Sequence, residues 1–131
     1  MIAWGQSHDY GFSCSAEGSN NPLSAEGFNI EAFSIAPNQV NAYIGFRAPL
    51  VGDSKAVIAV LENFVGWFNN GVPNSRPQIG NPIELDLGGR GIRAMECNSN
   101  GCLIVAGSSA NDPNYAIYTW SGFAGDTLFL R

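Results

Sequence analysis

Two stretches of the sequence repeat the same layout 62 positions apart. Residues 28–50, FNIEAFSIAPNQVNAYIGFRAPL, and residues 90–109, RGIRAMECNSNGCLIVAGSS, each suggest two strands around a polar turn. Ala32 of the first stretch matches Ala94 of the second. Self-similarity among strands favours blades of a β-propeller, in which one sheet unit repeats around a channel.

The repeat sets the expected domain organisation. We expect a single all-β domain over residues 1–131, with repeat units at about residues 28–66 and 83–131. With one constant offset, Ile44 of the first unit should occupy the place of Ala106 in the second. The fold class that follows is all-β, with about two β-propeller-type blades in this chain.

Further strands are expected outside the repeated hairpins. KAVIAVLEN, residues 55–63, is apolar on both faces and favours a strand packed on both sides, with a short helix as the alternative. IELDL, NYAIYTW and DTLFLR alternate or are rich in β-branched and aromatic residues, which is typical of strands. The N-terminal stretch Met1–His8 is also expected to be a strand.

Two blades do not make a ring, because propellers have about four to eight blades. The ring is therefore expected to be completed by self-association. A homotrimer with six blades is favoured, and a homodimer is the alternative, as a four-bladed ring or through a non-ring contact. Met1–His8 and Asp126–Arg131 are expected to pair across chains. A two-sheet sandwich and a fragment of a longer propeller protein are the other readings.

The charge balance argues against two classes of partner. The 131 residues hold six Lys and Arg against 11 Asp and Glu, for a formal net charge of −5. Nucleic acids and anionic membrane surfaces are bound through basic clusters, so neither is an expected partner. No apolar run has the length of a membrane span and no signal peptide is visible, so the cytoplasm is the default location.

The cysteine pattern leaves one redox question open. Three cysteines without CxxC spacing argue against a zinc site or a disulfide framework. Cys97 and Cys102 flank the turn NSNG and could bridge a hairpin. Free thiols acting as small apolar side chains are favoured over that disulfide.

The segments IGFRAPL, LDLGGRGIR, LIVAG and YTWSG together resemble an uncharacterised propeller-like family catalogued as a domain of unknown function. The resemblance covers about residues 28–122 and implies a propeller-type fold. The family has no assigned activity, so the resemblance leaves function open. The chain departs from the family pattern at Ala32, Arg90 and Ala94, and family members are typically more than twice as long.

Four charged residues lie inside the strands that carry the resemblance, and they are the first candidates for a binding site: Glu31, Arg47, Arg93 and Glu96. Glu31 and Arg93 hold equivalent positions in the two repeat units. Because buried charges need partners, both arginines are expected to be buried and paired with the two glutamates. The cluster is interpreted either as a set of salt bridges that fixes blade register or as an anion- or carbonyl-binding site at a channel mouth.

His8 is the only histidine and is the remaining candidate residue. One histidine cannot form a His-rich metal site, and no cofactor motif occurs, so no metal or cofactor is expected. His8 as a general base, oriented by Asp9 or Glu31, would suit a hydrolase-like enzyme with a site at the channel mouth. No GxSxG motif supports that alternative. The sequence favours a non-catalytic binding or assembly module whose small-molecule ligand it does not identify.

Overall fold

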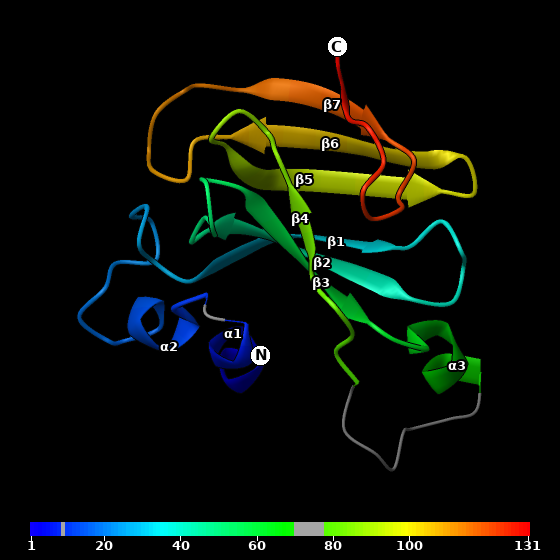
Figure 1. The fold of residues 1–131 in the computed structure, drawn as a ribbon, viewed down its shortest axis with the longest axis horizontal. Helices are drawn as coiled ribbons and strands as arrows, with labels where there is room; N and C mark the ends of the chain where they lie inside the picture. The colour runs from blue at the N-terminus through cyan, green and yellow to red at the C-terminus, as the bar shows by residue number, and fades with distance from the viewer. Residues whose placement is uncertain (9, 70–77) are drawn as a thin grey trace.

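The computed structural model describes residues 1–8, 10–69 and 78–131, which form two four-stranded antiparallel sheets and short helices (Figure 1). The first sheet has the order β1-β2-β3-β4, with β1 (Asn29–Ile35), β2 (Ala42–Ala48), β3 (Ala56–Leu61) and β4 (Ile83–Leu85). The second has the order β5-β6-β7-β8, with β5 (Gly91–Asn98), β6 (Gly101–Gly107), β7 (Ala116–Trp120) and β8 (Phe129–Leu130). The helices are α1 (Ile2–Ser7), α2 (Phe12–Ser15) and α3 (Phe64–Asn69).

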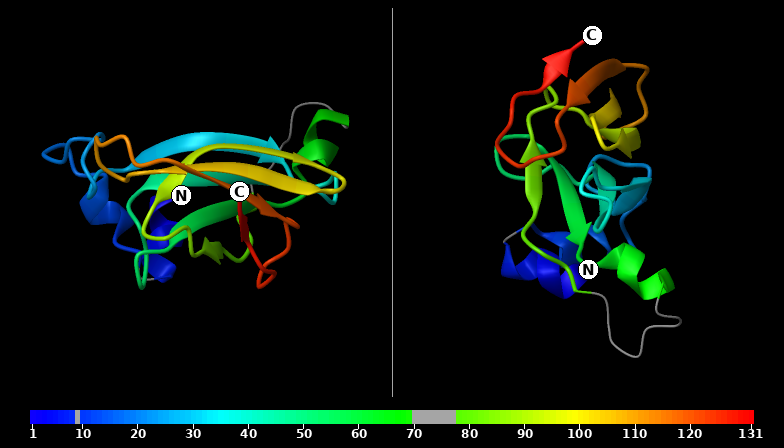
Figure 2. Two further views of the ribbon diagram at one scale, coloured as in Figure 1. Left: turned by 90° about the horizontal axis from the view of Figure 1, so that it is seen from above. Right: turned by 90° about the vertical axis from the view of Figure 1, so that its right-hand side faces the viewer.

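Each sheet is a meander in which neighbours in the sequence are neighbours in the sheet. The chain passes from β4 at the edge of the first sheet to β5 at the edge of the second. Strand β5 then lies against β1 and β2, so that the two sheets pack together (Figures 1 and 2). The described strands close neither a barrel nor a ring.

The two sheets share an irregularity at equivalent positions. The register between β1 and β2 shifts at Glu31, and the register between β5 and β6 shifts at Arg93. A residue inserted in this way bends its strand and turns its own side chain in a new direction. The side chains of Glu31 and Arg93 are therefore redirected at equivalent positions of the two hairpins.

The predicted offset of 62 residues between equivalent positions of the two units is wrong for the second strand of each hairpin. The register aligns Ile44 of β2 with Ile104 of β6, whereas the offset predicted Ala106. The cause is the turn after β1, residues 36–41, which is two residues longer than its counterpart after β5.

The main core lies between the two sheets. All six residues of β3 are buried, which confirms a strand in KAVIAVLEN and excludes the helical alternative. The strands of the second sheet alternate, with one face buried and the other exposed. The buried members that meet across the sheets include Tyr43, Ile58, Ile92, Ile104 and Trp120.

The N-terminal segment is not the predicted strand, because residues 2–7 form α1. Along this segment Met1, Trp4, Gly5 and His8 are at least partly buried, whereas Ile2, Ala3 and Ser7 are exposed. That spacing is the helical period, which brings one face onto the first sheet.

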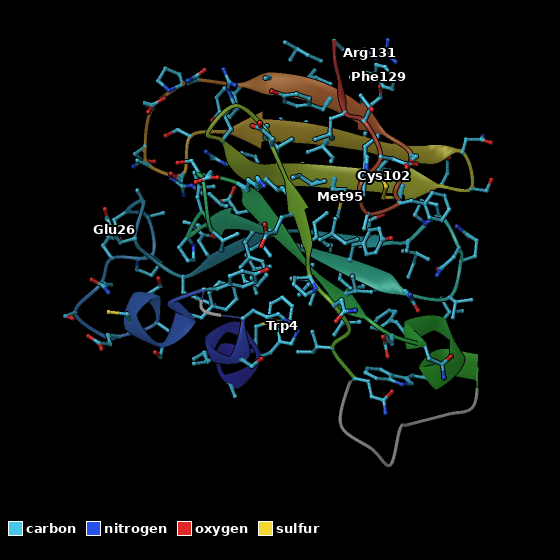
Figure 3. All side chains as sticks on the ribbon, viewed as in Figure 1. Trp4, Glu26, Met95, Cys102, Phe129 and Arg131 are labelled. Atoms are coloured by element: carbon cyan, nitrogen blue, oxygen red, sulfur yellow. A yellow bond between two sulfur atoms is a disulfide. The ribbon has the colours of Figure 1, made fainter. Side chains whose placement is uncertain are left out.

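This segment covers the outer face of the first sheet, the face turned away from the second sheet. Phe12 of α2 is fully buried and stacks near Phe46 of β2, with ring centroids 5.0 Å apart. The Trp4 indole N–H donates a hydrogen bond to the Gly80 carbonyl at 3.0 Å. Val57 of β3 lies in the same apolar cluster. Figure 3 labels Trp4 of this cluster, which lies between α1 and the first sheet.

The structure contains a disulfide between Cys97 and Cys102, so the expectation of free thiols at these positions is wrong. The register explains the bond, because the two residues lie directly opposite each other on β5 and β6. Cys14 is free and exposed.

Candidate functional site

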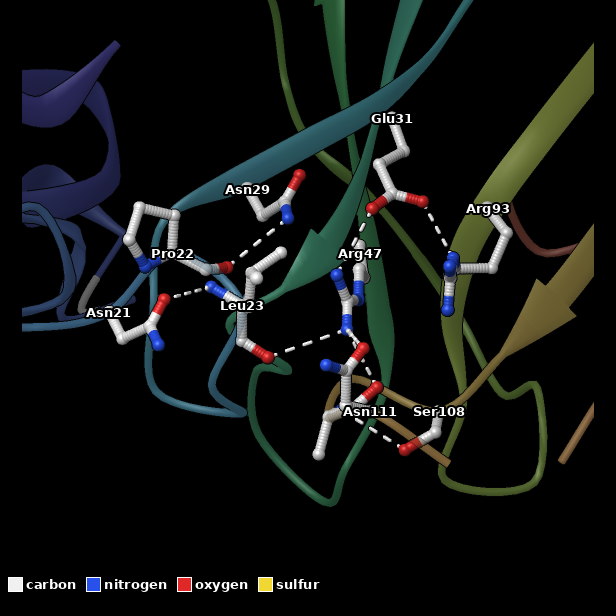
Figure 4. Close-up of polar contacts among 10 residues, drawn as sticks. Asn21, Pro22, Leu23, Asn29, Glu31, Arg47, Arg93, Ser108 and Asn111 are labelled. Carbon is white, nitrogen blue, oxygen red and sulfur yellow. Dashed lines mark hydrogen bonds and ion pairs between the residues drawn. The ribbon is translucent and has the colours of Figure 1, made fainter. Parts of the chain in front are cut away.

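The candidate site is built around Glu31, whose two carboxylate oxygens bind different arginines (Figure 4). Arg47 on β2 donates from Nη1 to Oε1 at 3.2 Å. Arg93 on β5 donates from Nε to Oε2 at 2.6 Å. Glu31 is the bulged residue of β1, and the bulge brings its carboxylate between the two sheets. The sequence prediction that Glu31, Arg47 and Arg93 meet is confirmed.

Arg47 is the most buried charged residue in the described chain, with 2 % of its side chain exposed. Its Nη2 donates to the backbone carbonyls of Ala110, at 2.7 Å, and Leu23, at 3.4 Å, and lies 3.5 Å from Oδ1 of Asn111. The guanidinium therefore joins three segments that are distant in the sequence. Its Nε has no partner among the described residues.

These contacts assign Arg47 a structural role. The carbonyl groups that it binds belong to this chain, to the segment before β1 and to the loop between β6 and β7. A ligand would have to displace one of them to reach the guanidinium. Burial of a charge is tolerated here because the carboxylate and carbonyl oxygens replace its lost hydration.

The Arg93 guanidinium is more accessible to a ligand than that of Arg47. Its side chain is 22 % exposed, and its guanidinium lies 5.5 Å from the centre of the Tyr115 ring. Stacking of this kind is typical of arginine and holds the planar group in one orientation. Only its Nε is used by Glu31. Arg93 is therefore mostly buried, as predicted, but less deeply than Arg47.

The other two candidates lie elsewhere. Glu96 projects to the exposed face of β5 and has no ion pair in the described structure, so the predicted pairing of Glu96 with an arginine is wrong. His8 packs beside the Trp4 ring, 4.9 Å between centroids, and its Nδ1 donates to the Trp4 carbonyl at 2.8 Å. It does not join Glu31. Asp9, the other orienting carboxylate considered, lies outside the described residues.

Two further hydrogen bonds cross the junction of the sheets, and sequence reasoning missed both. The backbone N–H of Cys97 donates to the buried hydroxyl of Ser34 at 2.9 Å. The Tyr43 hydroxyl donates to the Gly122 carbonyl at 2.7 Å. In each of these hydrogen bonds one partner is a backbone group, which any residue supplies. No residue pattern in the sequence therefore predicts them.

Burial changes the titration of two tyrosines. Burial, followed by the hydrogen bond to Glu84 at 2.8 Å and the negative charge of that residue, raises the pKa of Tyr10 well above its usual value. Burial likewise raises the pKa of Tyr43. Both effects favour the neutral phenol, which is the hydrogen-bond donor in each contact.

Among the described residues no group of three or more His, Cys, Asp or Glu side chains could hold a metal ion. In the same residues no helix is long and apolar enough to cross a bilayer. Outside the Glu31 cluster, the described residues form several surface grooves and one open sheet face.

The open face is the outer face of the second sheet, which we define by Leu103, Val105, Ile117, Thr119 and Phe129. These residues lie in adjacent positions on β6, β7 and β8. Leu103 is 48 % exposed, Ile117 45 % and Phe129 57 %. A groove of about 390 Å³ runs along this face beside Glu96 and Trp120.

Comparison of the chain with models of protein families, with curated proteins and with solved structures gave no match.

Proposed function

We propose that this chain is a non-catalytic assembly module of β-propeller type, which forms a homodimer through the outer face of its second sheet. The two meanders and the passage from β4 to β5 support the propeller-type reading, since successive blades are joined from the outer strand of one to the inner strand of the next. The resemblance noted in the sequence points the same way.

The observation that carries the proposal is the difference between the two outer faces. On the first sheet, the outward residues Phe46, Val57 and Ala59 are buried under the N-terminal segment. On the second sheet, the equivalent face exposes Leu103 and Ile117 to solvent. A contiguous apolar sheet face on a protein surface marks an interaction site, and one apolar sheet face packs well on another.

The charges at the edges of this face favour a second copy as its occupant. Glu96 lies on β5 at one edge, and Arg131 follows β8 at the other, with its Nε bonded to Thr119 at 2.9 Å. A twofold axis parallel to the strands would place β5 of one copy over β8 of the other. Glu96 would then face Arg131 at both ends, so the face is complementary to itself.

The N-terminal segment makes a ring less favourable than this dimer. A head-to-tail ring packs the open face of one copy on the outer face of the first sheet of the next. That second surface is occupied by Trp4, Tyr10 and Phe12. The homotrimer expected from blade number would require these aromatic side chains to leave the sheet, whereas the isologous dimer leaves them in place.

The enzyme alternative has less support. His8 and Glu31 belong to different clusters, and both oxygens of Glu31 are taken by arginines. The disulfide of Cys97 and Cys102 supports an oxidising compartment in place of the cytoplasm expected by default.

The oligomeric state tests the proposal. Sedimentation of the intact chain at micromolar concentration should give twice the mass of 13.9 kDa. Ile117→Arg and Leu103→Glu each place a charge in the centre of the apolar face, and each should give a monomer that stays folded by circular dichroism. Val40→Arg is the matched control, because Val40 is 46 % exposed but lies in the turn after β1.

A charge exchange tests the orientation. Glu96→Arg alone should weaken the dimer, and Glu96→Arg with Arg131→Glu should restore it. A monomeric wild type would overturn the proposal, as would a dimer that survives both charged substitutions. A trimer would show that the ring forms in spite of the N-terminal segment.

A further inference from the structure

A second groove lies between the sheets, at the opposite end of β1 from Glu31. It has a volume of about 330 Å³, which is within the size range of small-molecule sites. Its walls come from the turn after β1, the ends of β2 and β3, the approach to β4, and the loop after β7. The proposed dimer face does not include this groove.

The polar groups of the groove are amides and one carboxylate. Asn38, Asn41, Asn81 and Glu62 line it. Oδ1 of Asn38 accepts hydrogen bonds from the N–H groups of Val40, at 2.9 Å, and Asn41, at 3.0 Å, which fixes the side chain. Its amide N–H₂ keeps its donors, because no described group accepts from it.

Asn41 and Asn81 provide further donors of the same kind. Oδ1 of Asn41 accepts from the backbone N–H of Asn63 at 3.1 Å, so that its amide N–H₂ also remains without an acceptor in the described residues. No hydrogen bond engages the Asn81 side chain there, and none engages the carboxylate of Glu62. The groove therefore presents several donors next to a strong acceptor.

The apolar wall is the loop after β7, and it is held firmly. The Tyr43 hydroxyl binds the Gly122 carbonyl, and the Trp120 indole N–H donates to the Phe123 carbonyl at 3.0 Å. The hydroxyl of Ser121 accepts from the Phe123 N–H at 3.1 Å. The Phe123 ring is nevertheless 60 % exposed beside the groove. A loop held in one conformation presents this ring as a preformed contact surface, which lowers the cost of binding a ligand there.

The lining residues disfavour two classes of small ligand, anions and purely apolar molecules. No Lys or Arg lines the groove among the described residues, while Glu62 does. A phosphate or carboxylate would meet an uncompensated negative charge. A purely apolar ligand would bury amide groups without partners.

From this combination we propose that the groove between the sheets binds a neutral sugar. A pyranose presents neighbouring hydroxyl groups, each a donor and an acceptor, which amide and carboxylate side chains can satisfy in pairs. Its C–H face is apolar and packs on an aromatic ring such as Phe123. The groove has room for one or two residues of a glycan.

Titration of the intact ¹⁵N-labelled protein with neutral sugars tests the proposal. The probes are glucose, galactose, mannose, N-acetylglucosamine and their common disaccharides at millimolar concentrations. At least one should give saturable amide shifts centred on the groove, at Asn41, Asn81 and Gly122. Asn81→Ala and Phe123→Ala should each weaken that binding about tenfold, the effect of one hydrogen bond or one ring contact.

Matched variants outside the groove keep the test specific. Asn100→Ala and Phe33→Ala remove the same residue types from the turn after β5 and from an exposed position on β1, and should leave sugar affinity unchanged. Choline is the competing probe, because Glu62 and Phe123 would also suit a cation. Saturable binding of choline without any sugar would overturn the proposal. So would the absence of saturable shifts for every sugar, or equal losses from the control variants.

Discussion

Glu31 and Arg93 are the bulged residues of two equivalent strands, 62 positions apart, and they bind each other at 2.6 Å across the junction of the sheets. The same β-bulge in both sheets thus positions a carboxylate in the first sheet and a guanidinium in the second. The pair locks the relative height of β1 and β5 at one end, while Ser34 and Tyr43 hold the junction further along.

Substitution of the two arginines should have unequal effects. Arg47→Ala should lower the free energy of unfolding by about 3–5 kcal/mol, because it leaves a carboxylate oxygen and two carbonyl groups without their buried donor. Arg93→Ala should cost about 1 kcal/mol, because this side chain is partly exposed and its pair is screened by water. Urea unfolding measures both, and a larger cost for Arg93→Ala would contradict the assigned roles.

Gly91→Ala should destabilise the protein by about 1–3 kcal/mol, the usual cost of overpacking. A Cβ at Gly91 of β5 would overlap the backbone carbonyl of Arg47 on β2. Gly18→Ala is the matched control, since a Cβ there meets nothing within 4 Å. The two thermal midpoints should differ clearly, and equal midpoints would refute the close approach.

Ser34→Ala should lower the free energy of unfolding by about 1–3 kcal/mol, since it leaves the Cys97 N–H buried without an acceptor. Hydrogen exchange at the Cys97 amide should accelerate at the same time. Ser13→Ala, at an exposed position, should alter neither quantity. An unchanged exchange rate at the Cys97 amide would show that Ser34 does not protect this N–H group.

The stability should fall in alkaline solution. The pKa of Tyr10 is raised in the folded state, so folded Tyr10 keeps its proton to a higher pH than unfolded Tyr10. Its contribution is complete below the unfolded pKa of about 10 and is lost as the pH rises through the folded value. Tyr43 acts in the same direction. Urea midpoints on both sides of about pH 10 should therefore diverge less in Tyr10→Phe than in the wild type. Equal divergence would mean that Tyr10 does not contribute.

Alkylation of the unfolded, unreduced chain should modify one thiol, that of Cys14. After reduction, three thiols should react, and the free energy of unfolding should fall by about 2 kcal/mol, because the loop closed by Cys97 and Cys102 is short. Mass spectrometry counts the labels. Three labels without reductant would restore the interpretation of free thiols.

The strands were predictable because their signal is local. Alternation and β-branched composition placed β1, β2, β3 and β7, and the repeat indicated that Glu31 and Arg93 are equivalent. The N-terminal helix was missed although Trp4, Gly5 and His8 follow a helical period, because a helix of only six residues carries a weak signal.

The site was only partly predictable because half of its partners are backbone groups. That Arg47 and Arg93 would meet a carboxylate followed from the need to pair buried charges. That Arg47 would also hold Leu23 and Ala110 depends on where two loops return to the sheet, which local composition does not encode. The pairing of Cys97 with Cys102 depended on the hairpin register in the same way.

The N-terminal segment makes the outer faces of the two sheets unlike, because it buries that of the first sheet and leaves that of the second sheet exposed. In stacked repeat arrays a terminal unit with a shielded outer surface stops growth. A chain with an open apolar face at both ends would add copies head to tail, and the result is a ring if the rotation closes and a filament if it does not. Phe12 and its neighbours cover the first sheet, so the proposed association through the open face of the second sheet would stop after two copies. In the proposed assembly the N-terminal segment would limit the number of copies, and its removal should allow larger assemblies to form.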